Sequence, residues 1–344
     1  MQWRVATRMT DRRLLTAARC LLMSALCLLL SACDQQAAPT GQAPADNNPD
    51  TQSAPASPTI VSLTPAVTQM LIDMGKREHL VGVSTVDDKM LGLPTCGRYN
   101  DPDVAKILAL GADIVITESS RGDGQDVPAL MRTAAARGAF KLVVMPNSRS
   151  IADVERALTD AEAGLGKAVG DPAAAERARD LMSARLELVN AVVKDLPAPR
   201  VLMLIDPATL GALGPGATHD EMLKLAGGRN AIAHLDTAYV KLQIEQVQKD
   251  VRPDVVLIFE PGGRPVADKN DARLRALKHL AVPAVTNRRI VVIDHPAAML
   301  PSTASPAVVA QMAKAIHPGR AEAIDQAYDV ADKLATPSDA GGGP

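Results

Sequence analysis

Arginine, tyrosine and histidine side chains stand in several predicted loops of this 344-residue chain. Arginine binds carboxylates through paired hydrogen bonds, and a phenolate or an imidazole can ligate iron. In open parallel sheets, ligands bind in the crevice at the carboxyl ends of the strands. The loops expected at such ends carry Arg98, Tyr99, Ser119, Arg121, Glu260, Arg264 and His295. We therefore expect these residues to bind a small molecule, with Tyr99 and His295 as candidate iron ligands.

Each of these side chains also has a simpler explanation. Tyr99 can pack its ring on the protein surface, a loop histidine is commonly just solvated, and a single arginine is an ordinary surface charge. No two of the 6 histidines have the close spacing of a metal site built from side chains, so binding of a free metal ion ranks lower. The sequence has no phosphate loop, dinucleotide-binding glycine fingerprint or nucleophile elbow, and catalysis is therefore not expected.

Short runs of β-branched and apolar residues alternate with helical patterns along the chain. The expected strands are 60–63, 80–83, 114–117, 142–145, 201–205, 255–259 and 290–293. The expected helices are 66–75, 102–110, 127–137, 220–226, 242–250 and 274–280. Such alternation indicates parallel sheets covered by helices on both faces. With 344 residues, of which 47% are hydrophobic, the chain is large enough for two α/β lobes.

A long helix is predicted between the two halves. Asp171 is a favourable N-cap, Pro172 is a favourable first residue, and no helix breaker follows before Pro197. From Pro172 to Leu196 this helix would be roughly 38 Å long, enough to run across both lobes. The predicted architecture is therefore α/β, with two lobes of mostly parallel sheet, one long spanning helix and a ligand cleft between the lobes. A long surface helix of a single domain is the alternative.

The N-terminus has the features of a lipoprotein leader. Arg12, Arg13 and Arg19 give a positive flank to an apolar stretch at residues 21–30 that is too short to span a bilayer comfortably. Leu30-Ser31-Ala32-Cys33 resembles a bacterial lipobox, in which the cysteine is acylated and becomes the new N-terminus. We expect a signal peptide over 1–32, lipidation of Cys33 and anchoring in the periplasm, at the inner membrane because Asp34 resembles a retention signal. A plain signal peptide with an incidental cysteine is the alternative.

The remaining segments divide the chain by composition. Residues 33–58 are mostly small and polar and cannot bury enough apolar surface to fold, so they form a flexible tether. The tail 335–344 is predicted to be unstructured in the same way. Between these ends we expect an N-terminal α/β lobe over 59–168, the connecting helix over 169–197 and a C-terminal α/β lobe over 198–334.

Composition also limits the choice of ligands and partners. The formal net charge of -2 gives no basic field for nucleic acid. Aromatic residues make up 2% of the chain, which argues against a stacking platform of several rings. Once the leader is removed and Cys33 is lipidated, Cys96 is the remaining thiol, and we expect it to be a small buried hydrophobic residue.

Several blocks of the sequence are similar to one protein family. The segment 59–71, Thr-Ile-Val-Ser-Leu-Thr-Pro-Ala-Val-Thr-Gln-Met-Leu, resembles the first strand, turn and helix of the periplasmic binding proteins with a helical backbone. The segments 80–84, 103–110 and 220–230 resemble later blocks, in the family's order and spacing. The resemblance implies two lobes joined by a rigid helix, with a cleft between them and little hinge closure.

The resemblance also implies a function. Members of this family capture metal chelates such as haem, ferric siderophores or cobalamin and deliver them to an ABC permease and its ATPase. The chain would then be a monomer with no intrinsic cofactor, and its ligand would be the chelate. A storage or sensing lipoprotein without a transport role, or a binder of free metal ions, is the alternative. The histidine set of the family's zinc-binding branch is not recognisable here.

Individual positions can be carried over from the family. Tyr99 stands where several haem binders have a tyrosine that faces the cleft, and Tyr239 resembles the position where the second lobe supplies a ring. Family members commonly dock to the permease through one acidic residue on each lobe. Here Asp103 and Glu245 are the candidates, although the matching first-lobe position is Ala105. The tyrosines and His295 favour haem, the arginines leave siderophores open, and the few rings count against cobalamin.

Overall fold

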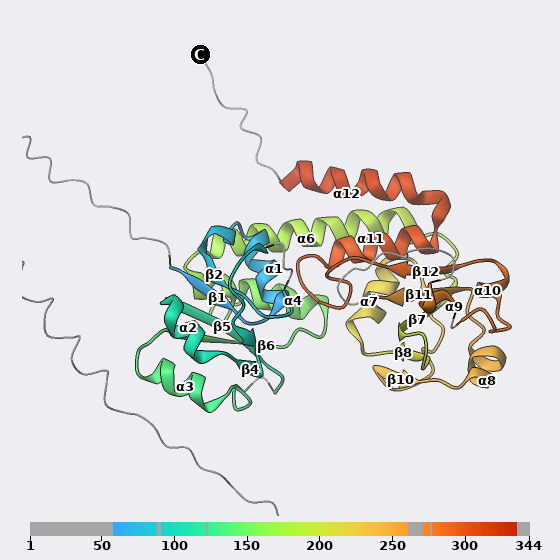
Figure 1. Cartoon of the computed structure of the whole chain (residues 1–344). Helices are drawn as coiled ribbons and strands as arrows, with labels where there is room; N and C mark the ends of the chain where they lie inside the picture. Colours follow the sequence, from blue (N-terminus) through green and yellow to red (C-terminus); the bar gives the residue numbers. More distant parts are fainter. Residues whose placement is uncertain (1–57, 88–90, 122, 261–270, 276, 336–344) are drawn as a thin grey trace, which may run out of the picture. The chain divides into compact units, whose positions relative to one another are not determined.

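The computed structural model of the chain describes residues 58–87, 91–121, 123–260, 271–275 and 277–335. These residues form two α/β lobes (Figure 1). The predicted signal peptide, nearly all of the tether and tail, Cys33 and Arg264 lie outside the described residues. Among the residues that are described, no helix is both long enough and apolar enough to cross a membrane.

The first lobe contains a parallel sheet with the strand order β2-β1-β5-β6. Its strands are β1 (Ile60–Ser62), β2 (Leu80–Gly82), β5 (Ile114–Ser119) and β6 (Lys141–Pro146). Two very short strands, β3 (Gly97–Arg98) and β4 (Asp101–Pro102), form a separate hairpin. All four strands expected in the first half of the chain are therefore confirmed.

Helices cover both faces of this sheet. They are α1 (Pro65–Asp73), a 3₁₀ turn (Arg77–His79), α2 (Val104–Leu110), α3 (Ala129–Ala136), α4 (Ile151–Thr159) and α5 (Leu165–Val169). Because side chains alternate along a strand, Ile114 and Ile116 of β5 pack with α1 and α4, whereas Val115 packs with α2 and α3. Cys96 is buried in the second of these clusters, as expected from the sequence.

The second lobe contains a mixed sheet with the order β10-β8-β7-β11-β12, and β9 pairs with β7. Its strands are β7 (Arg200–Asp206), β8 (Gly211–Leu213), β9 (Arg229–Asn230), β10 (Tyr239–Lys241), β11 (Val255–Phe259) and β12 (Ile290–Ile293). Its helices are α7 (Thr218–Leu225), α8 (Ile244–Gln246), a π-helical turn (Val247–Val251), α9 (Ala272–Arg275), α10 (Pro283–Thr286), α11 (Ser305–Ile316), a 3₁₀ turn (Pro318–Arg320) and α12 (Ala321–Ala335).

The second lobe differs from the sequence prediction in several places. The helix expected over 274–280 is instead the short α9 followed by a turn, and α10, α11 and α12 were not predicted. The antiparallel strands β8 and β10 and the short strand β9 were not predicted. The helix expected over 242–250 is instead the short α8 followed by a π-helical turn, of which Val247 and Val251 are buried. His317, which follows α11, is half-buried, with its Nε2 3.2 Å from the carbonyl oxygen of Gly227.

The predicted long helix is α6 (Pro172–Val193), with 22 residues and a length of roughly 33 Å. Asp171 caps it by accepting a hydrogen bond from the amide of Ala174 at 3.0 Å, as the sequence predicts. Lys76, which follows α1, forms an ion pair with Asp171 at 2.6 Å. α6 contacts α4 and α5 of the first lobe and α7 and α11 of the second, so it joins the two lobes. α12 packs along α6 as well.

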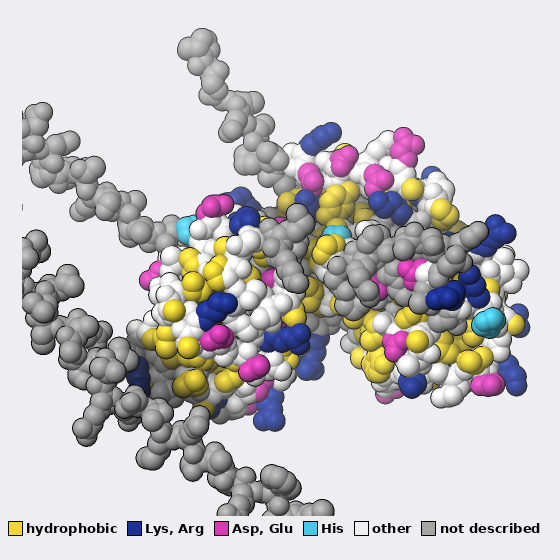
Figure 2. Space-filling model, in the orientation of Figure 1, with side chains coloured by type: hydrophobic (Ala, Val, Ile, Leu, Met, Phe, Trp, Pro, Cys, Tyr) yellow, Lys and Arg dark blue, Asp and Glu magenta, His cyan; other side chains and the backbone are white. Residues whose placement is uncertain are grey.

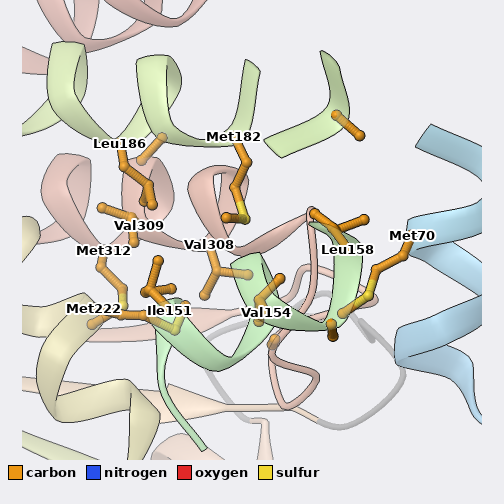
Figure 3. Packing of buried hydrophobic residues seen from close by; sticks show 14 of the residues in the cluster. Met70, Ile151, Val154, Leu158, Met182, Leu186, Met222, Val308, Val309 and Met312 are labelled. Atoms are coloured by element: carbon orange, nitrogen blue, oxygen red, sulfur yellow. The ribbon is translucent and has the colours of Figure 1, made fainter. Parts of the chain in front are cut away.

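One hydrophobic core extends through both lobes (Figure 3). It contains Leu158 of α4, Met182 of α6, Met222 of α7 and Val308 of α11, all of them buried. Side chains of α4, from the first lobe, therefore pack directly with side chains of α7 and α11, from the second. Separating the lobes would expose this apolar surface to water, at a cost of about 25 cal/mol for each Å².

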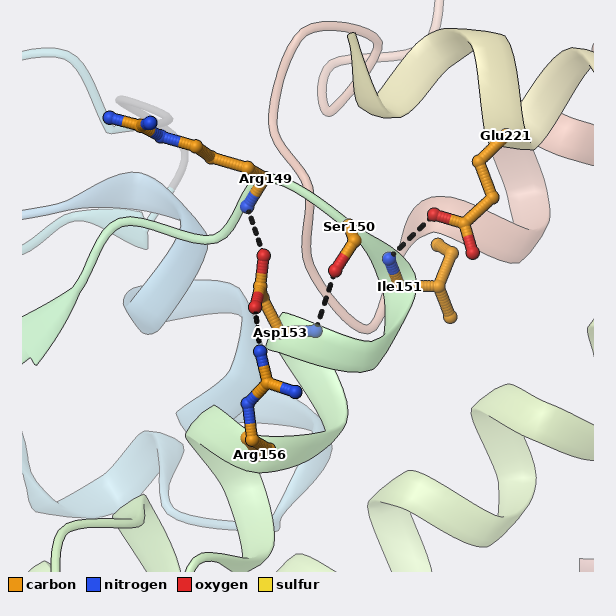
Figure 4. A network of polar contacts seen from close by, with 6 residues as sticks. All are labelled: Arg149, Ser150, Ile151, Asp153, Arg156 and Glu221. Carbon is orange, nitrogen blue, oxygen red and sulfur yellow. Dashed lines mark hydrogen bonds and ion pairs between the residues drawn. The ribbon is translucent and has the colours of Figure 1, made fainter. Parts of the chain in front are cut away.

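A hydrogen bond between the lobes adds to this core (Figure 4). Ser150 caps α4 by accepting from the amide of Asp153 at 3.0 Å. Glu221 of α7 accepts a hydrogen bond from the amide of Ile151, the first residue of α4, at 3.0 Å. A carboxylate at a helix N-terminus is stabilised by the free amide groups and the helix dipole. Glu221 thus fixes the position of α7 relative to α4.

The shared core predicts that the two lobes unfold together. We expect Met182→Ala to lower the free energy of unfolding by about 2–5 kcal/mol, because it leaves a cavity between helices of both lobes. Urea unfolding, followed by circular dichroism, should still show one transition at a lower midpoint. Glu187→Ala, at an exposed position of α6, is the control and should change the free energy by less than about 0.5 kcal/mol. Two separate transitions would contradict the shared core.

Candidate ligand-binding site

Three of the sequence-predicted site residues lie at or just beyond the carboxyl ends of parallel strands, in both lobes. Ser119 is the last residue of β5, Glu260 follows β11, and His295 follows β12 after Asp294. Glu260 is 6% exposed, and its amide donates to the carbonyl oxygen of Ile293 at 3.2 Å, which ties the ends of β11 and β12 together. The carboxyl ends of parallel strands share one edge of a sheet, so each lobe gathers its candidate residues at one edge.

The Ser119 hydroxyl is used inside the loop that follows β5. Ser119 is buried, and its Oγ donates to Asp126 Oδ1 at 2.6 Å. The amide and hydroxyl groups of Ser120 donate to Asp126 Oδ2 at 2.7 and 2.5 Å. These bonds from Ser119 and Ser120 hold the pKa of the Asp126 carboxyl far below its usual range. Asp126 therefore shapes the loop that presents Arg121.

Three arginines lie exposed on first-lobe loops near this edge. Arg98 is in β3, Arg121 is in the loop after β5, and Arg149 is in the loop after β6. The Arg149 guanidinium donates to the carbonyl oxygen of Ser120 at 3.5 Å, which places it next to the loop of Arg121. Figure 4 shows the Arg149 side chain extending away from α4. Arg149 was not among the predicted site residues, although its position just beyond the predicted strand 142–145 was a signal for it.

The two candidate tyrosines are both accessible. Tyr99 is 39% exposed in the two-residue turn of the β3–β4 hairpin. Tyr239 is 51% exposed in β10. A Cβ atom at Gly211 would come within 2.7 Å of the Tyr239 hydroxyl and 3.4 Å of the Cβ of Asp206, the last residue of β7. The Tyr239 phenol thus lies close over Gly211, at the edge of the second-lobe sheet where β7 ends.

His295 is held by its own loop. Its Nδ1 accepts a hydrogen bond from the amide of Ala297 at 3.1 Å, so Nε2 is the nitrogen available to a ligand. Burial lowers the pKa of His295, an effect opposed by the charge of Asp294, and a neutral imidazole is the form that ligates metals. Buried His219 of α7 supports the loop, because its Nε2 lies 2.7 Å from the carbonyl oxygen of Ala298.

A pocket of about 410 Å³ lies between the lobes. This volume is within the range of small-molecule sites, roughly 300–1,000 Å³. The described residues that line it are Pro65, Thr68, Gln69, Ile72, Val86, Asp87 and Leu91 from the first lobe and Pro296, Ala297 and Leu300 from the second. None of these belongs to the sequence-predicted set, but Pro296 directly follows His295. The loop after β12 therefore forms part of a pocket that both lobes line.

Glu118 is a further acidic residue at this edge. It lies in a segment that the sequence predicted to line the cleft, but no ligand role was predicted for it. It is the next-to-last residue of β5 and pairs in register with Met145 of β6. Burial raises the pKa of the Glu118 carboxyl to about 7. Among the described residues, no group of three or more His, Cys, Asp or Glu side chains is placed to hold a metal ion.

The sequence profile of the family described as "Periplasmic binding protein" matches residues 60–297. The chain therefore belongs to this family of binding proteins, which agrees with the expectation that it is not an enzyme. Sequence comparison with curated proteins gave no match.

Solved structures share the fold. The periplasmic haem-binding protein RhuT from Roseiflexus sp. RS-1 is 22% identical with a TM-score of 0.61, over 78% of this chain and 99% of RhuT. The periplasmic haem-binding protein HutB of Vibrio cholerae is 19% identical with a TM-score of 0.62, over 76% of this chain and 100% of HutB. The vitamin B12-binding protein BtuF of Vibrio cholerae is 21% identical with a TM-score of 0.55, over 80% of this chain and 98% of BtuF. These similarities confirm the two-lobed fold.

The bonds to Asp126 predict how its loop responds to mutation. Asp126→Ala removes the acceptor for Ser119 and Ser120, and we expect faster trypsin cleavage after Arg121, measured by limited proteolysis and mass spectrometry. Because folding lowers the pKa of the Asp126 carboxyl, its hydrogen bonds give their full stabilisation above the unfolded pKa of about 3.9. This stabilisation is lost only as the pH falls through the pKa of the folded state. The matched control is Asp123→Ala, which removes one bond to the amide of Gln125. Equal cleavage of all three proteins would refute the role of Asp126.

Proposed function

We propose that this chain is the substrate-binding lipoprotein of an ABC importer and that it captures a metal chelate, namely haem, a ferric siderophore or cobalamin. The observation that carries the proposal is the two-lobed fold of a periplasmic binding protein, and exposed arginine and tyrosine and half-buried histidine side chains on the two lobes support it. The similar structures include proteins that bind haem and vitamin B12. A chelate supplies its own metal ligands, so it needs no cluster of protein side chains around a bare ion.

The proposed contacts are divided between the lobes. Arg98, Arg121 and Arg149 of the first lobe would bind carboxylates or other oxyanions at the edge of the chelate. Tyr99, Tyr239 and the Nε2 of His295 would bind the metal or pack on the chelate. Ser119, Glu260 and Arg264 are also proposed to belong to the site, and Ser119 would act through the loop that it shapes. Lipidation of Cys33 would anchor the protein on the periplasmic side of the inner membrane.

Binding of a chelate can be measured directly. We expect the purified chain from residue 34 onward to bind hemin, cyanocobalamin or a ferric siderophore saturably, as followed by an absorbance titration. If hemin binds, a shifted Soret band should be lost in Tyr99→Phe or His295→Ala, because each removes a candidate iron ligand. Exposed His279 provides the control His279→Ala, which should leave the spectrum unchanged. No binding of any chelate would refute the proposed function.

Delivery to a permease is tested at Asp103 and Glu245. Both side chains are exposed, but Asp103 also caps α2 by accepting from the amide of Lys106 at 3.0 Å. Asn caps a helix as well as Asp, so Asp103→Asn removes the charge and keeps the cap. We expect Asp103→Asn combined with Glu245→Gln to lower cellular uptake several-fold with unchanged ligand affinity.

The control for the docking experiment is Asp101→Asn combined with Asp250→Asn, two exposed carboxylates close by in the sequence, and it should transport normally. Normal uptake in the Asp103 and Glu245 variant would contradict docking through these residues. Normal ligand binding without any uptake by the unmodified protein would favour the alternative of a storage or sensing lipoprotein.

A further inference from the structure

Glu118 lies on the inner face of the first-lobe sheet. Side chains alternate along β5, so Glu118 points to the same face as Ile114 and Ile116, which belong to the core shared with α1, α4 and α6. Its register partner, Met145, is buried in that same core. Glu118 is therefore the polar end of an otherwise apolar row, at the carboxyl end of a central strand.

The other side of Glu118 is bounded by the start of α1. Ser62 pairs with Ile116, and the amide of Leu63 donates to the carbonyl oxygen of Ile116 at 2.9 Å. The backbone of Thr64 is still extended, so the register places Thr64 beside Glu118. Thr64 is the N-cap of α1, and its buried hydroxyl has no hydrogen-bond partner among the described residues. Thr64 and Glu118, two adjacent polar side chains at this edge, thus have no hydrogen-bond partner for their side chains among the described residues.

Within the described residues, nothing offsets the free-energy cost of burying the Glu118 carboxyl. No hydrogen bond or ion pair of Glu118 occurs there, and burial is the cause of its raised pKa of about 7. Its side chain is only partly covered, so part of its surface faces solvent. A mostly buried carboxyl without a partner lowers stability, and such groups are characteristic of functional sites.

We propose that Glu118 is a ligand contact and that it binds an amide group of the chelate. This inference rests on the proposed function and narrows its ligand class. An amide offers an N–H donor and a carbonyl acceptor, so it can pair with an ionised carboxylate through the donor and with a neutral carboxylic acid through both groups. Corrinoids and hydroxamate siderophores both have amide groups on their surface.

Haem fits Glu118 poorly. Its edge consists of methyl, vinyl and propionate groups, and an ionised propionate has no hydrogen to donate. An ionised Glu118 next to a propionate would place two like charges in a partly buried site, which is unfavourable. Glu118 thus favours the amide-bearing chelates over haem, whereas Tyr99 and His295 taken alone favour haem.

The test compares three chelates and two variants. Cyanocobalamin, ferrioxamine B and hemin are titrated separately into the purified chain, into Glu118→Gln and into Glu118→Leu. We expect the unmodified chain to bind cyanocobalamin or ferrioxamine B more tightly than hemin. Glu118→Leu should weaken that binding by about ten- to a hundred-fold, because a buried hydrogen bond to a charged group is lost. Glu118→Gln, which keeps a donor and an acceptor, should bind nearly as well as the unmodified chain.

Thermal unfolding of the ligand-free proteins separates this role from a structural one. Glu118→Leu should be as stable as the unmodified chain or more so, because it replaces an unpartnered carboxyl with an apolar group. Exposed Glu78 of the same lobe provides the control Glu78→Leu, which should change neither chelate binding nor the midpoint of thermal unfolding. A lower midpoint for Glu118→Leu would show a structural partner and overturn the inference.

The remaining outcomes distinguish the inference from the proposed function. If cyanocobalamin or ferrioxamine B binds Glu118→Leu as tightly as the unmodified chain, the inference is wrong and the proposed function stands. If hemin binds tightly and the other two chelates do not, the inference is likewise wrong and the proposed function stands. If none of the three chelates binds the unmodified chain, the proposed function fails and the inference fails with it.

Discussion

The joining of the two lobes depends on the packing of α4 against α7 and α11. These helices come from different lobes, and they bury Leu158, Met222 and Val308 in one core beneath α6. The bond from the amide of Ile151 to Glu221 joins the same elements. Protein interiors are packed as densely as organic crystals, so separating these helices would cost free energy. The loops at the strand ends of the two lobes are therefore attached to sheets that share this core.

Polar residues at the strand ends have two kinds of roles. Asp126, Asp206 and the Ser119 hydroxyl form hydrogen bonds within their own loops and give these loops their shape. Arg98, Arg121 and Tyr99 instead remain exposed on the loops. His295 combines both roles, since its Nδ1 binds its own loop while its Nε2 stays available. Hydrogen bonds within these loops lower their conformational freedom, which reduces the entropy cost of any binding by them.

The parallel strands and α6 could be predicted from sequence because their signals are local. β11 is a continuous run of buried apolar residues, and α6 begins at an N-cap followed by proline. The burial of Glu118 could not be predicted, since it depends on α1 and α4 packing over the end of β5. The meeting of the loops after β5 and β6 through Arg149 and Ser120 is likewise a tertiary contact. Local patterns thus predicted the layers of the fold, and side-chain contacts between distant segments had to come from the structure.

The shared core also determines the order in which the chain can fold. The apolar face of α4 packs against α7 and α11. Of these, α11 (Ser305–Ile316) is among the last elements to be synthesised. The first lobe therefore cannot complete its core while the second lobe is unfinished, although its sheet is already whole by Pro146. Contacts over such large sequence separations slow folding and leave apolar surface exposed in the meantime. Until α11 has folded, the apolar face of α4 in the partly synthesised chain stays exposed unless another molecule covers it.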